Sequence, residues 1–463
     1  MDRRIWAFTF CWLGLASLAF AQTPVPDDDA QAPDAAQEQD DSDRPPASPR
    51  RSGPTIYQGT DGEMAEEMGP DSDYGSPYDS YGPVSGGCSD GCCDAGGSCD
   101  SGHCGHGGYA NCQGGGFWGR LETLGWWVRG SQLPVLVTTS PQGTAQASAG
   151  VLPSATEVFG NERVDGEGRI GGRVTIGYWT DDCETAGADG NFWGLEDKGT
   201  HFRQSSNGNP ILARPFFNTQ TRQQDAGLTA FPGFVTGTID IRTSSEVLGG
   251  EANLRHMVYK HCNRRVDAIA GYRFFRMDED LTINDFNTSI DPISNIPVGT
   301  TFNINDAFST ENEFHGGQLG LLMQYKHDCW ALNIGAKVAL GNMLQRVNIA
   351  GSTRIEVPGA TAVDNEGGFL ALGSNSGEFS HSRFSVIPEF GINLAWNVSC
   401  LWTANIGYNF IYVTNVARPG DQIDLNIDPN QFPPAISGNQ PAFAFNDTDV
   451  WIQGINIGLG CRF

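Results

Sequence analysis

Cysteine and histidine are the side chains of this sequence with the clearest chemical potential. A stretch rich in Gly, Ser and Asp holds six cysteines and two histidines: Cys88, Cys92, Cys93, Cys99, Cys104, Cys112, His103 and His106. Thiolates and imidazoles at short spacing can bind zinc. The spacings follow no paired CxxC frame, and almost no apolar residue is available to build a domain around a metal. Disulfides or links between chains therefore fit better, and we expect no metal site.

A second group of residues could carry hydrolytic or cation chemistry. His315 and His381 stand near the starts of two predicted strands, with Ser382 and Asp278 in the same region. No spacing supports a nucleophile and its base, so we expect structural histidines, no catalytic residue, no cofactor and no enzyme. The run 278–280 offers three carboxylates to calcium, but a solvated charge run explains it more simply.

The N-terminus resembles an export signal. Arg3 and Arg4 precede an apolar run over residues 5–20, and Ala19-Phe20-Ala21 supplies a small-x-small cleavage pattern. We expect residues 1–21 to be a cleaved signal peptide; a signal anchor is the alternative. The chain has twelve cysteines, which suits an oxidising compartment. Loss of Cys11 with the signal would leave an odd number, so one thiol would be free or paired between chains.

Residues 22–87 form an acidic segment without periodic hydrophobicity. Fifteen Asp and Glu stand there against three Arg, among many Pro, Gly, Ser and Gln. Such a segment buries too little apolar surface to offset its chain entropy, so we expect it to be disordered. The Cys/Gly-rich residues 88–116 follow it. The whole chain carries a formal net charge of −26, which excludes nucleic acid as an electrostatic partner.

From residue 117 to 463 apolar and small polar residues alternate with period two, which predicts half-buried strands. Trp330, Leu332, Ile334 and Ala336 share one face, for example, and Asn333, Gly335 and Lys337 the other. Ten segments of this kind are long enough to cross a bilayer as tilted strands: residues 117–128, 170–180, 190–203, 247–259, 265–277, 312–325, 329–341, 382–396, 400–413 and 450–463.

The connections between these segments alternate between short and long. Short turns on one rim and long loops on the other are typical of outer-membrane barrels. The sequence therefore predicts an all-β fold, an antiparallel up-and-down transmembrane β-barrel of about ten strands over residues 117–463. Both ends of the barrel would face the periplasm. The long connections are rich in Asn, Gly, Pro, Ser and Thr, and we expect solvated loops.

The character of the two faces favours a membrane barrel over a soluble sandwich. The polar face carries mostly Gly, Asn, Ala and Ser, which suit a crowded lumen. Aromatic residues lie near both ends of the apolar face, as at the two membrane interfaces. A Lys facing lipid near the midplane costs about 2–4 kcal/mol, so charged residues should face inward. Parity then predicts these lumen-lining residues, paired as internal salt bridges: Arg120, Glu122, Arg173, Glu251, Arg255, Asp267, Arg273, Lys337 and Glu389.

Five further cysteines fall at or near the predicted short turns: Cys183, Cys262, Cys329, Cys400 and Cys461. Cys400 and Cys461 would stand on adjacent strands, near the same end and on the same face. A disulfide between them is feasible if their Cα atoms lie within about 7 Å, and we predict it. The alternative is that all five are small buried or interface residues.

Two motifs in order resemble a known family. They are Trp118-x3-Glu122-x-Leu124-x-Trp126-Trp127 with Pro134-x-Leu136-Val137-Thr138-Thr139, followed by Gly172-Arg173…Gly177…Trp179. The sequence is similar here to the putative beta-barrel porin family of planctomycete-type outer-membrane proteins. The resemblance covers residues 117–463 and implies an outer-membrane barrel with a presumed porin activity. The terminal Phe463, after alternating apolar residues, resembles the signal read by the outer-membrane barrel assembly machinery.

These patterns leave two functional hypotheses. The first is a passive pore for small solutes. The second is a structural or adhesive cell-envelope protein, whose closed barrel anchors long surface loops and a cysteine-crosslinked tail. A ten-stranded barrel is narrow enough for side chains to fill, which keeps the second hypothesis open. The expected partners are outer-membrane lipid, the barrel assembly machinery and disulfide-linked or homo-oligomeric envelope neighbours, in the cell outer membrane.

Overall fold

The computed structural model describes residues 116–463, except residues 262, 294–295, 400 and 434–436. The predicted signal peptide 1–21, the acidic segment 22–87 and the cysteine–histidine cluster all lie outside these residues. Within the described part of the chain, no helix combines the length and apolar character needed to cross a membrane.

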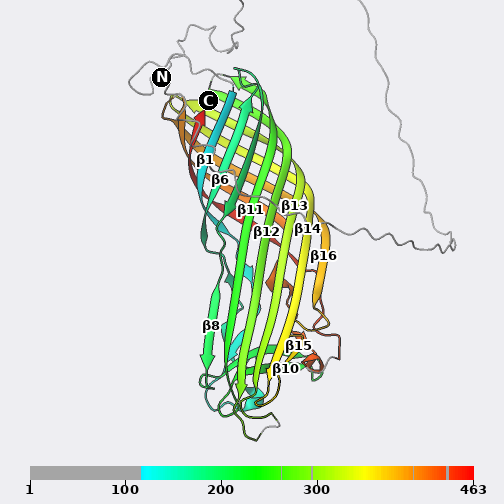
Figure 1. Cartoon of the computed structure of the whole chain (residues 1–463). Helices are drawn as coiled ribbons and strands as arrows, with labels where there is room; N and C mark the ends of the chain where they lie inside the picture. The colour runs from blue at the N-terminus through cyan, green and yellow to red at the C-terminus, as the bar shows by residue number, and fades with distance from the viewer. Residues whose placement is uncertain (1–115, 262, 294–295, 400, 434–436) are drawn as a thin grey trace, which may run out of the picture. The chain divides into compact units, whose positions relative to one another are not determined.

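Ten antiparallel strands form a closed ring, which Figure 1 shows with both termini of the barrel at the same end. Each strand pairs with its sequence neighbour, and the last pairs with the first, for example at Trp118 and Arg462. The predicted all-β, antiparallel up-and-down barrel is therefore confirmed. The strands are β1 (Gly116–Val128), β6 (Gly168–Trp179), β7 (Ala186–Leu195), β11 (Val235–His261), β12 (Arg264–Ser289), β13 (Thr301–His327), β14 (Trp330–Glu356), β16 (Gly377–Asn397), β17 (Trp402–Ala417) and β19 (Asp447–Arg462).

Two features of the strands differ from the sequence prediction. The predicted third strand is present as β7, but its predicted bounds, 190–203, are wrong, because β7 ends at Leu195 and a separate strand, β8 (His201–Ser206), pairs with a more distant part of β11. The charged residues 196–198 lie at the break. The strands β11 to β14 are also 26 or 27 residues long, about twice the length predicted.

The extra length of these strands goes with a reversal of polarity. On β13 the outward residues Leu319 and Leu321 are exposed, yet further along the same face stand Glu313 and Glu311. The inward face changes in the opposite sense and reaches the fully buried Phe308. Lipid favours apolar side chains outside, whereas water favours them inside. The reversal therefore marks the outer edge of the hydrocarbon, and the strands continue beyond it.

The long connections are not the solvated loops that we expected, because much of their length folds onto the extended strands. They supply a five-stranded sheet of β3 (Val137–Thr139), β4 (Thr156–Phe159), β9 (Leu212–Asn218), β10 (Gln223–Ala230) and β18 (Asn426–Ile427). They also supply a two-stranded sheet of β2 (Ser131–Gln132) and β5 (Arg163–Val164), and an edge strand, β15 (Val363–Glu366). Three short 3₁₀ helices complete them: η1 (Gln146–Ser148), η2 (Pro419–Gln422) and η3 (Pro429–Gln431).

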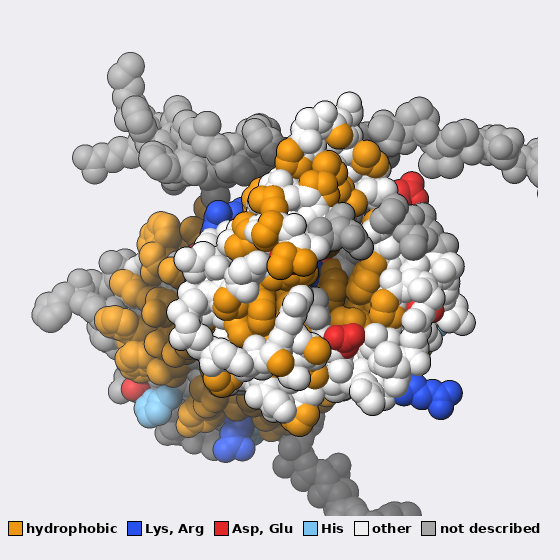
Figure 2. Space-filling view, turned by 90° about the horizontal axis from the view of Figure 1, so that it is seen from below, with side chains coloured by type: hydrophobic (Ala, Val, Ile, Leu, Met, Phe, Trp, Pro, Cys, Tyr) orange, Lys and Arg blue, Asp and Glu red, His pale blue; other side chains and the backbone are white. Residues whose placement is uncertain are grey.

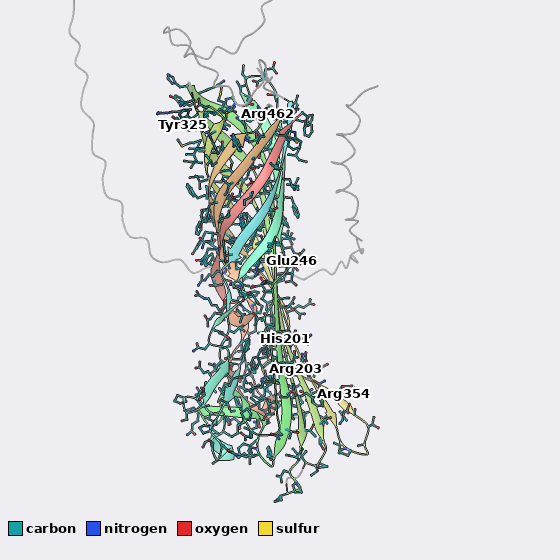
Figure 3. All side chains as sticks on the ribbon, turned by 90° about the vertical axis from the view of Figure 1, so that its left-hand side faces the viewer. His201, Arg203, Glu246, Tyr325, Arg354 and Arg462 are labelled. Carbon is teal, nitrogen blue, oxygen red and sulfur yellow. The ribbon has the colours of Figure 1, made fainter. Side chains whose placement is uncertain are left out.

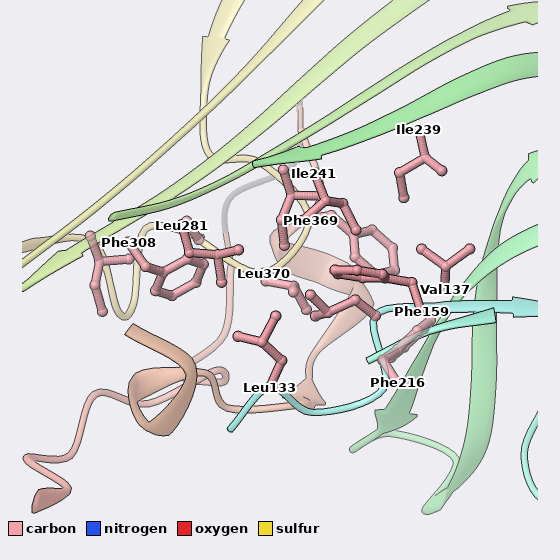
Figure 4. Packing of buried hydrophobic residues seen from close by; sticks show 14 of the residues in the cluster. Leu133, Val137, Phe159, Phe216, Ile239, Ile241, Leu281, Phe308, Phe369 and Leu370 are labelled. Carbon is pink, nitrogen blue, oxygen red and sulfur yellow. The ribbon is translucent and has the colours of Figure 1, made fainter. Parts of the chain in front are cut away.

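The apolar residues of these connections pack on the inward face of the extended strands. Figure 4 shows Leu281 and Phe308, from β12 and β13, in one cluster with Leu133 and Phe159 from the connections. We call this cluster of 21 buried residues the outer core. Many of its contributors come from short apolar runs in the connections that follow no period of two, such as residues 133–137 and 369–372, which is why alternation alone did not predict it. The outer core makes the part beyond the membrane a folded module.

A buried carboxylate joins two parts of this module. Asp306 of β13 accepts backbone N–H bonds from Phe369, Leu370 and Ala371 at 2.8, 2.8 and 2.9 Å. Its other oxygen accepts a hydrogen bond from Arg214 of β9 at 2.7 Å. Asp306 and Arg214 are both buried, so the pair is desolvated and each charge depends on the other.

We predict that Asp306→Ala loosens the outer module. Arg214 would keep a buried charge without its carboxylate, which typically costs about 3–5 kcal/mol. Limited proteolysis of the folded protein should then cut the module faster. The matched control is Asp364→Ala, because Asp364 pairs with Arg354 at 3.2 Å on the solvent-exposed surface and should matter little. Equal protease resistance in the two variants would contradict the role given to Asp306.

Candidate functional site: the barrel lumen

The lumen collects the charged residues of the membrane-spanning strands. The structure places all nine of the predicted lumen residues on inward positions, while neighbours such as Leu121 and Val174 are exposed on the outside. These residues come from six of the ten strands. Charges on strands that are not neighbours still meet, because their side chains reach across the ring. The nine residues fall into three ionic groups.

The first ionic group surrounds Glu122, whose side chain is fully buried. One carboxylate oxygen accepts a hydrogen bond from Arg173 Nε at 2.6 Å. The other accepts from the amides of Asn405 and Asn456 at 2.9 and 2.6 Å. Arg120 Nε lies 3.3 Å from the oxygen that Arg173 already occupies. Glu122 is therefore saturated, and Arg120 is held only loosely.

The second ionic group crosses the lumen between β11, β12, β14 and β16. Lys337 donates to Glu251 at 2.8 Å and lies 3.0 Å from Glu389. Arg273 donates to Glu389 at 2.6 Å. Gln318 donates a further hydrogen bond to Glu251 at 2.9 Å. Two cations thus face two carboxylates, and this balance offsets the desolvation that each charge suffers inside the barrel.

The third ionic group lies at the short-turn rim and includes three residues outside the predicted nine. Arg265 donates to Asp267 at 2.7 Å and to Glu184 at 2.7 Å. Glu184, in the β6–β7 turn, also lies 2.8 Å from Arg462 of β19. Arg255 is 3.3 Å from Asp267. The parity that places Asp267 and Arg273 inward also places Arg265 inward, and Arg462 shares the polar face of the last strand, whereas Glu184 lies in a turn that parity does not reach.

A cavity of about 860 Å³ occupies the half of the lumen nearest the short turns. Side chains of all three ionic groups line it, among them Arg120, Lys337 and Arg265. Asn397 and Arg462, at the ends of their strands, place its mouth at the short-turn rim. Figure 3 shows Arg462 and Tyr325 at this end of the molecule, whereas Glu246 lies near its middle. The cavity is therefore accessible from the side of the two termini of the barrel.

Beyond the ionic groups, bulky apolar residues fill the lumen. Nine of the ten strands contribute, and Trp126, Phe275 and Phe314 are among the fully buried contributors. Trp193 lies between Trp126 and Phe275, with ring centroids 5.1 and 6.5 Å apart. We call this cluster the apolar layer: Leu124, Trp126, Val128, Trp193, Leu195, Val247, Phe275, Met277, Phe314, Ala339, Met343, Ile387, Ile411, Val413, Val416, Val450 and Ile452. The apolar layer was not predicted from the sequence, because the inward face of the barrel strands was expected to be polar along its whole length.

The candidate hydrolytic residues are not brought together. His315 lies on the outward face of β13 and contacts Glu313 at 2.5 Å. His381 lies on β16 and packs against Phe445. The strand β14 separates β13 from β16. The run 278–280 is also divided. Glu279 points inward and forms a buried pair with Arg418 at 2.6 Å, while Asp278 and Asp280 face outward. The three carboxylates therefore do not converge on one point.

The rim cysteines are partly described. Cys183 and Cys329, in two of the short turns, are disulfide-bonded, as suits an oxidising compartment. Cys461 stands on β19, opposite Trp402. Cys400 and Cys262 lie outside the described residues, so the Cys400–Cys461 pairing stays a prediction. Phe463 is exposed, and its N–H donates to the carbonyl of Phe117 at 2.9 Å; its assembly role is likewise a prediction.

We predict that acid releases the β6–β7 turn. Burial raises the pKa of Glu184, but the charges of Arg462, Lys326 and Arg265 outweigh it, so the folded pKa lies below the ordinary value of 4.5. A lowered folded pKa gives stability that is present above the unfolded value and lost as pH falls through the folded one. Intrinsic-rate-corrected hydrogen exchange over residues 181–185 should increase below about pH 4.5. In the Glu184→Gln variant the amides of this turn should exchange fast at every pH. A pH profile of exchange equal to that of the wild type would contradict the prediction.

The fold and lumen can be compared with known proteins. The family model described as "Putative beta barrel porin-7 (BBP7)" matches residues 118–463. No curated protein matches. Among solved structures, the outer membrane protease OmpT from Escherichia coli is 10% identical, with a TM-score of 0.36, over 75% of this chain and 97% of that one.

Two other similar structures are transport proteins by their descriptions. The TodX monoaromatic hydrocarbon channel, as a deltaS2 mutant, is 8% identical with a TM-score of 0.21, over 75% of this chain and 90% of that one. The Ralstonia pickettii toluene transporter TbuX is 10% identical with a TM-score of 0.14, over 74% and 90%. Scores this low carry no activity over to this protein. The family match, which spans the whole barrel, does carry membership: the chain belongs to the putative beta barrel porin-7 family of outer-membrane β-barrel proteins.

Proposed function

We propose that this protein is a closed outer-membrane barrel that anchors a folded module at the cell surface. The apolar layer is the observation that carries this proposal. Its members Phe275, Met343 and Ile387 have no surface that a water molecule can touch, so the lumen offers no continuous aqueous path in this conformation. A passive porin needs such a path.

The outer module supports the same proposal. Its 21-residue outer core is as apolar as the core of a soluble domain, and buried pairs such as Arg418 with Glu279 attach it to the barrel strands. Seen from the outer end, the module presents mainly apolar and uncharged polar side chains and few charged ones (Figure 2). Such a surface suits contacts with other envelope or surface molecules. The protein would act by binding and display, without catalysis.

The alternative is a pore for small solutes, which the cavity in the inner half of the lumen favours. This function would require the apolar layer to part. Export would depend on a cleavable signal at residues 1–21 and on insertion by the barrel assembly machinery, whose recognition signal the alternating apolar residues before Phe463 resemble. Homo-oligomeric or disulfide-linked envelope neighbours would add further contacts, with the disulfides on the short-turn side where the rim cysteines lie.

Planar-bilayer recording tests closure directly. We expect the wild-type protein to be silent and Phe275→Ala to conduct, because loss of the ring breaches the apolar layer. Trp402→Ala is a matched control: it removes an exposed aromatic ring from the lipid-facing side and should stay silent. Folding of each variant is checked by heat-modifiable gel mobility, since Phe→Ala in a core costs about 3–5 kcal/mol. Regular open-channel steps from the wild type would overturn the proposal.

Surface display can be tested on intact cells. The β12–β13 hairpin ends in an exposed apolar tip, where Ile293 is 90% exposed and Val298 is 52% exposed. Thermolysin, which cuts before such residues, should cleave at this tip without permeabilisation, while the short turns should resist. A variant with Ile293→Asp and Val298→Asp should lose the cut. Cleavage that appeared only after permeabilisation would place the module on the wrong side of the membrane for display.

A further inference from the structure

The inner cavity carries positive charge in a strongly acidic protein. Seven Arg and Lys side chains line it against five carboxylates, although the chain as a whole has a formal charge of −26. Charge of one sign in a recess with low-dielectric walls raises the local concentration of the opposite ion. The cavity therefore attracts anions while the rest of the molecule repels them.

Most of the cavity's cations are already engaged. Lys337, Arg173 and Arg265 each donate to a carboxylate at 2.8 Å or less. Their charges are neutralised, and moving them would leave buried carboxylates unpaired. These residues form the walls of the cavity and have little capacity left for a ligand.

Arg120 and Arg255 are different. The nearest carboxylate oxygen to Arg120 is that of Glu122, at 3.3 Å, and Arg173 already occupies it. Arg255 reaches Asp189 and Asp267 only at 3.3 Å. The Nε groups of both arginines are buried and have no hydrogen-bond partner among the described residues. Both side chains are partly exposed, at 33% for Arg120 and 17% for Arg255, so their guanidinium groups can meet an added acceptor in the cavity.

The surroundings of these arginines are mixed in polarity. Trp118, Trp179 and Ile269 line the same cavity, and Arg255 stacks over the ring of Trp179 at 5.0 Å. A volume of about 860 Å³ lies within the range of small-molecule sites. The apolar layer closes the outer end, so entry is from the short-turn rim.

We propose that this cavity binds a small organic anion, a carboxylate or phosphate monoester, that enters from the periplasmic side and pairs with Arg120 and Arg255. The planar guanidinium fork matches the oxygens of either group. The aromatic and aliphatic walls receive the apolar part of the ligand. This inference goes beyond surface display and does not depend on it, because binding in the inner cavity needs neither an open nor a closed outer end.

Isothermal titration of the full-length protein, folded in detergent micelles, tests the proposal. The probes are benzoate and phenyl phosphate, with benzylammonium as a cation of matched size and empty micelles as the blank. We expect both anions to bind and benzylammonium not to bind. Arg120→Gln should weaken anion binding about tenfold or more, because it removes a charge-assisted hydrogen bond. Arg354→Gln makes the same change on the exposed outer strand and should bind like the wild type.

A steric variant keeps the test decisive if Arg120→Gln fails to fold. Gly460 lines the cavity, and a Cβ placed there meets nothing closer than 3.4 Å, with the Cβ of Arg120 at 3.9 Å. Gly460→Phe should therefore fold, leave every charge in place and block the anions. Absence of anion binding by the wild type, equal binding of benzylammonium, or undiminished binding by the folded variants would each overturn the proposal. None of these outcomes bears on conductance, so the two proposals can fail separately.

Discussion

The structure depends on one constraint: the long strands pass from hydrocarbon into water and must exchange their apolar face on the way. On β13 the exchange takes place between Leu319 and Glu313 on the outer face. Below that level the inside is mainly ionic, and above it the inside is mainly apolar with a few buried pairs such as Glu279 with Arg418. The same backbone hydrogen bonds pair the strands in lipid and in water, because these bonds lie within the sheet and do not depend on which of its faces contacts water. The apolar layer lies where the two regimes meet.

Inside the membrane the ionic groups solve the problem that the barrel creates. A ten-stranded ring is too narrow to leave its inward side chains in bulk water, so charges must be neutralised locally. Glu122, Glu251 and Glu389 each meet cations from other strands, and the resulting bridges tie distant parts of the ring together. Arg120 departs from this pattern, and for that reason it is the residue with most capacity for a ligand.

Much of the barrel could be predicted from the sequence because period-two alternation is a local signal. Parity placed Lys337 and its companions inside, since a single lipid-facing charge decides the orientation of a whole strand. The outer core could not be predicted in this way. Residues such as Leu133, Phe159 and Phe216 stand in short stretches without a strand or helix period, and only the extended strands bring them together. The apolar layer was missed because the prediction assumed one solvent along each strand.

The length of the β12–β13 hairpin has a mechanical consequence. From the level of His315 to Thr301 the strand runs a further 15 residues or so, which at about 3.4 Å per residue is about 50 Å along its axis. Because the outer core packs against the inward face of these strands, the hairpin resists bending. Its tip is held clear of the lipid headgroups, so a large object could touch it without approaching the bilayer, and a force applied there would be transmitted directly to the barrel wall.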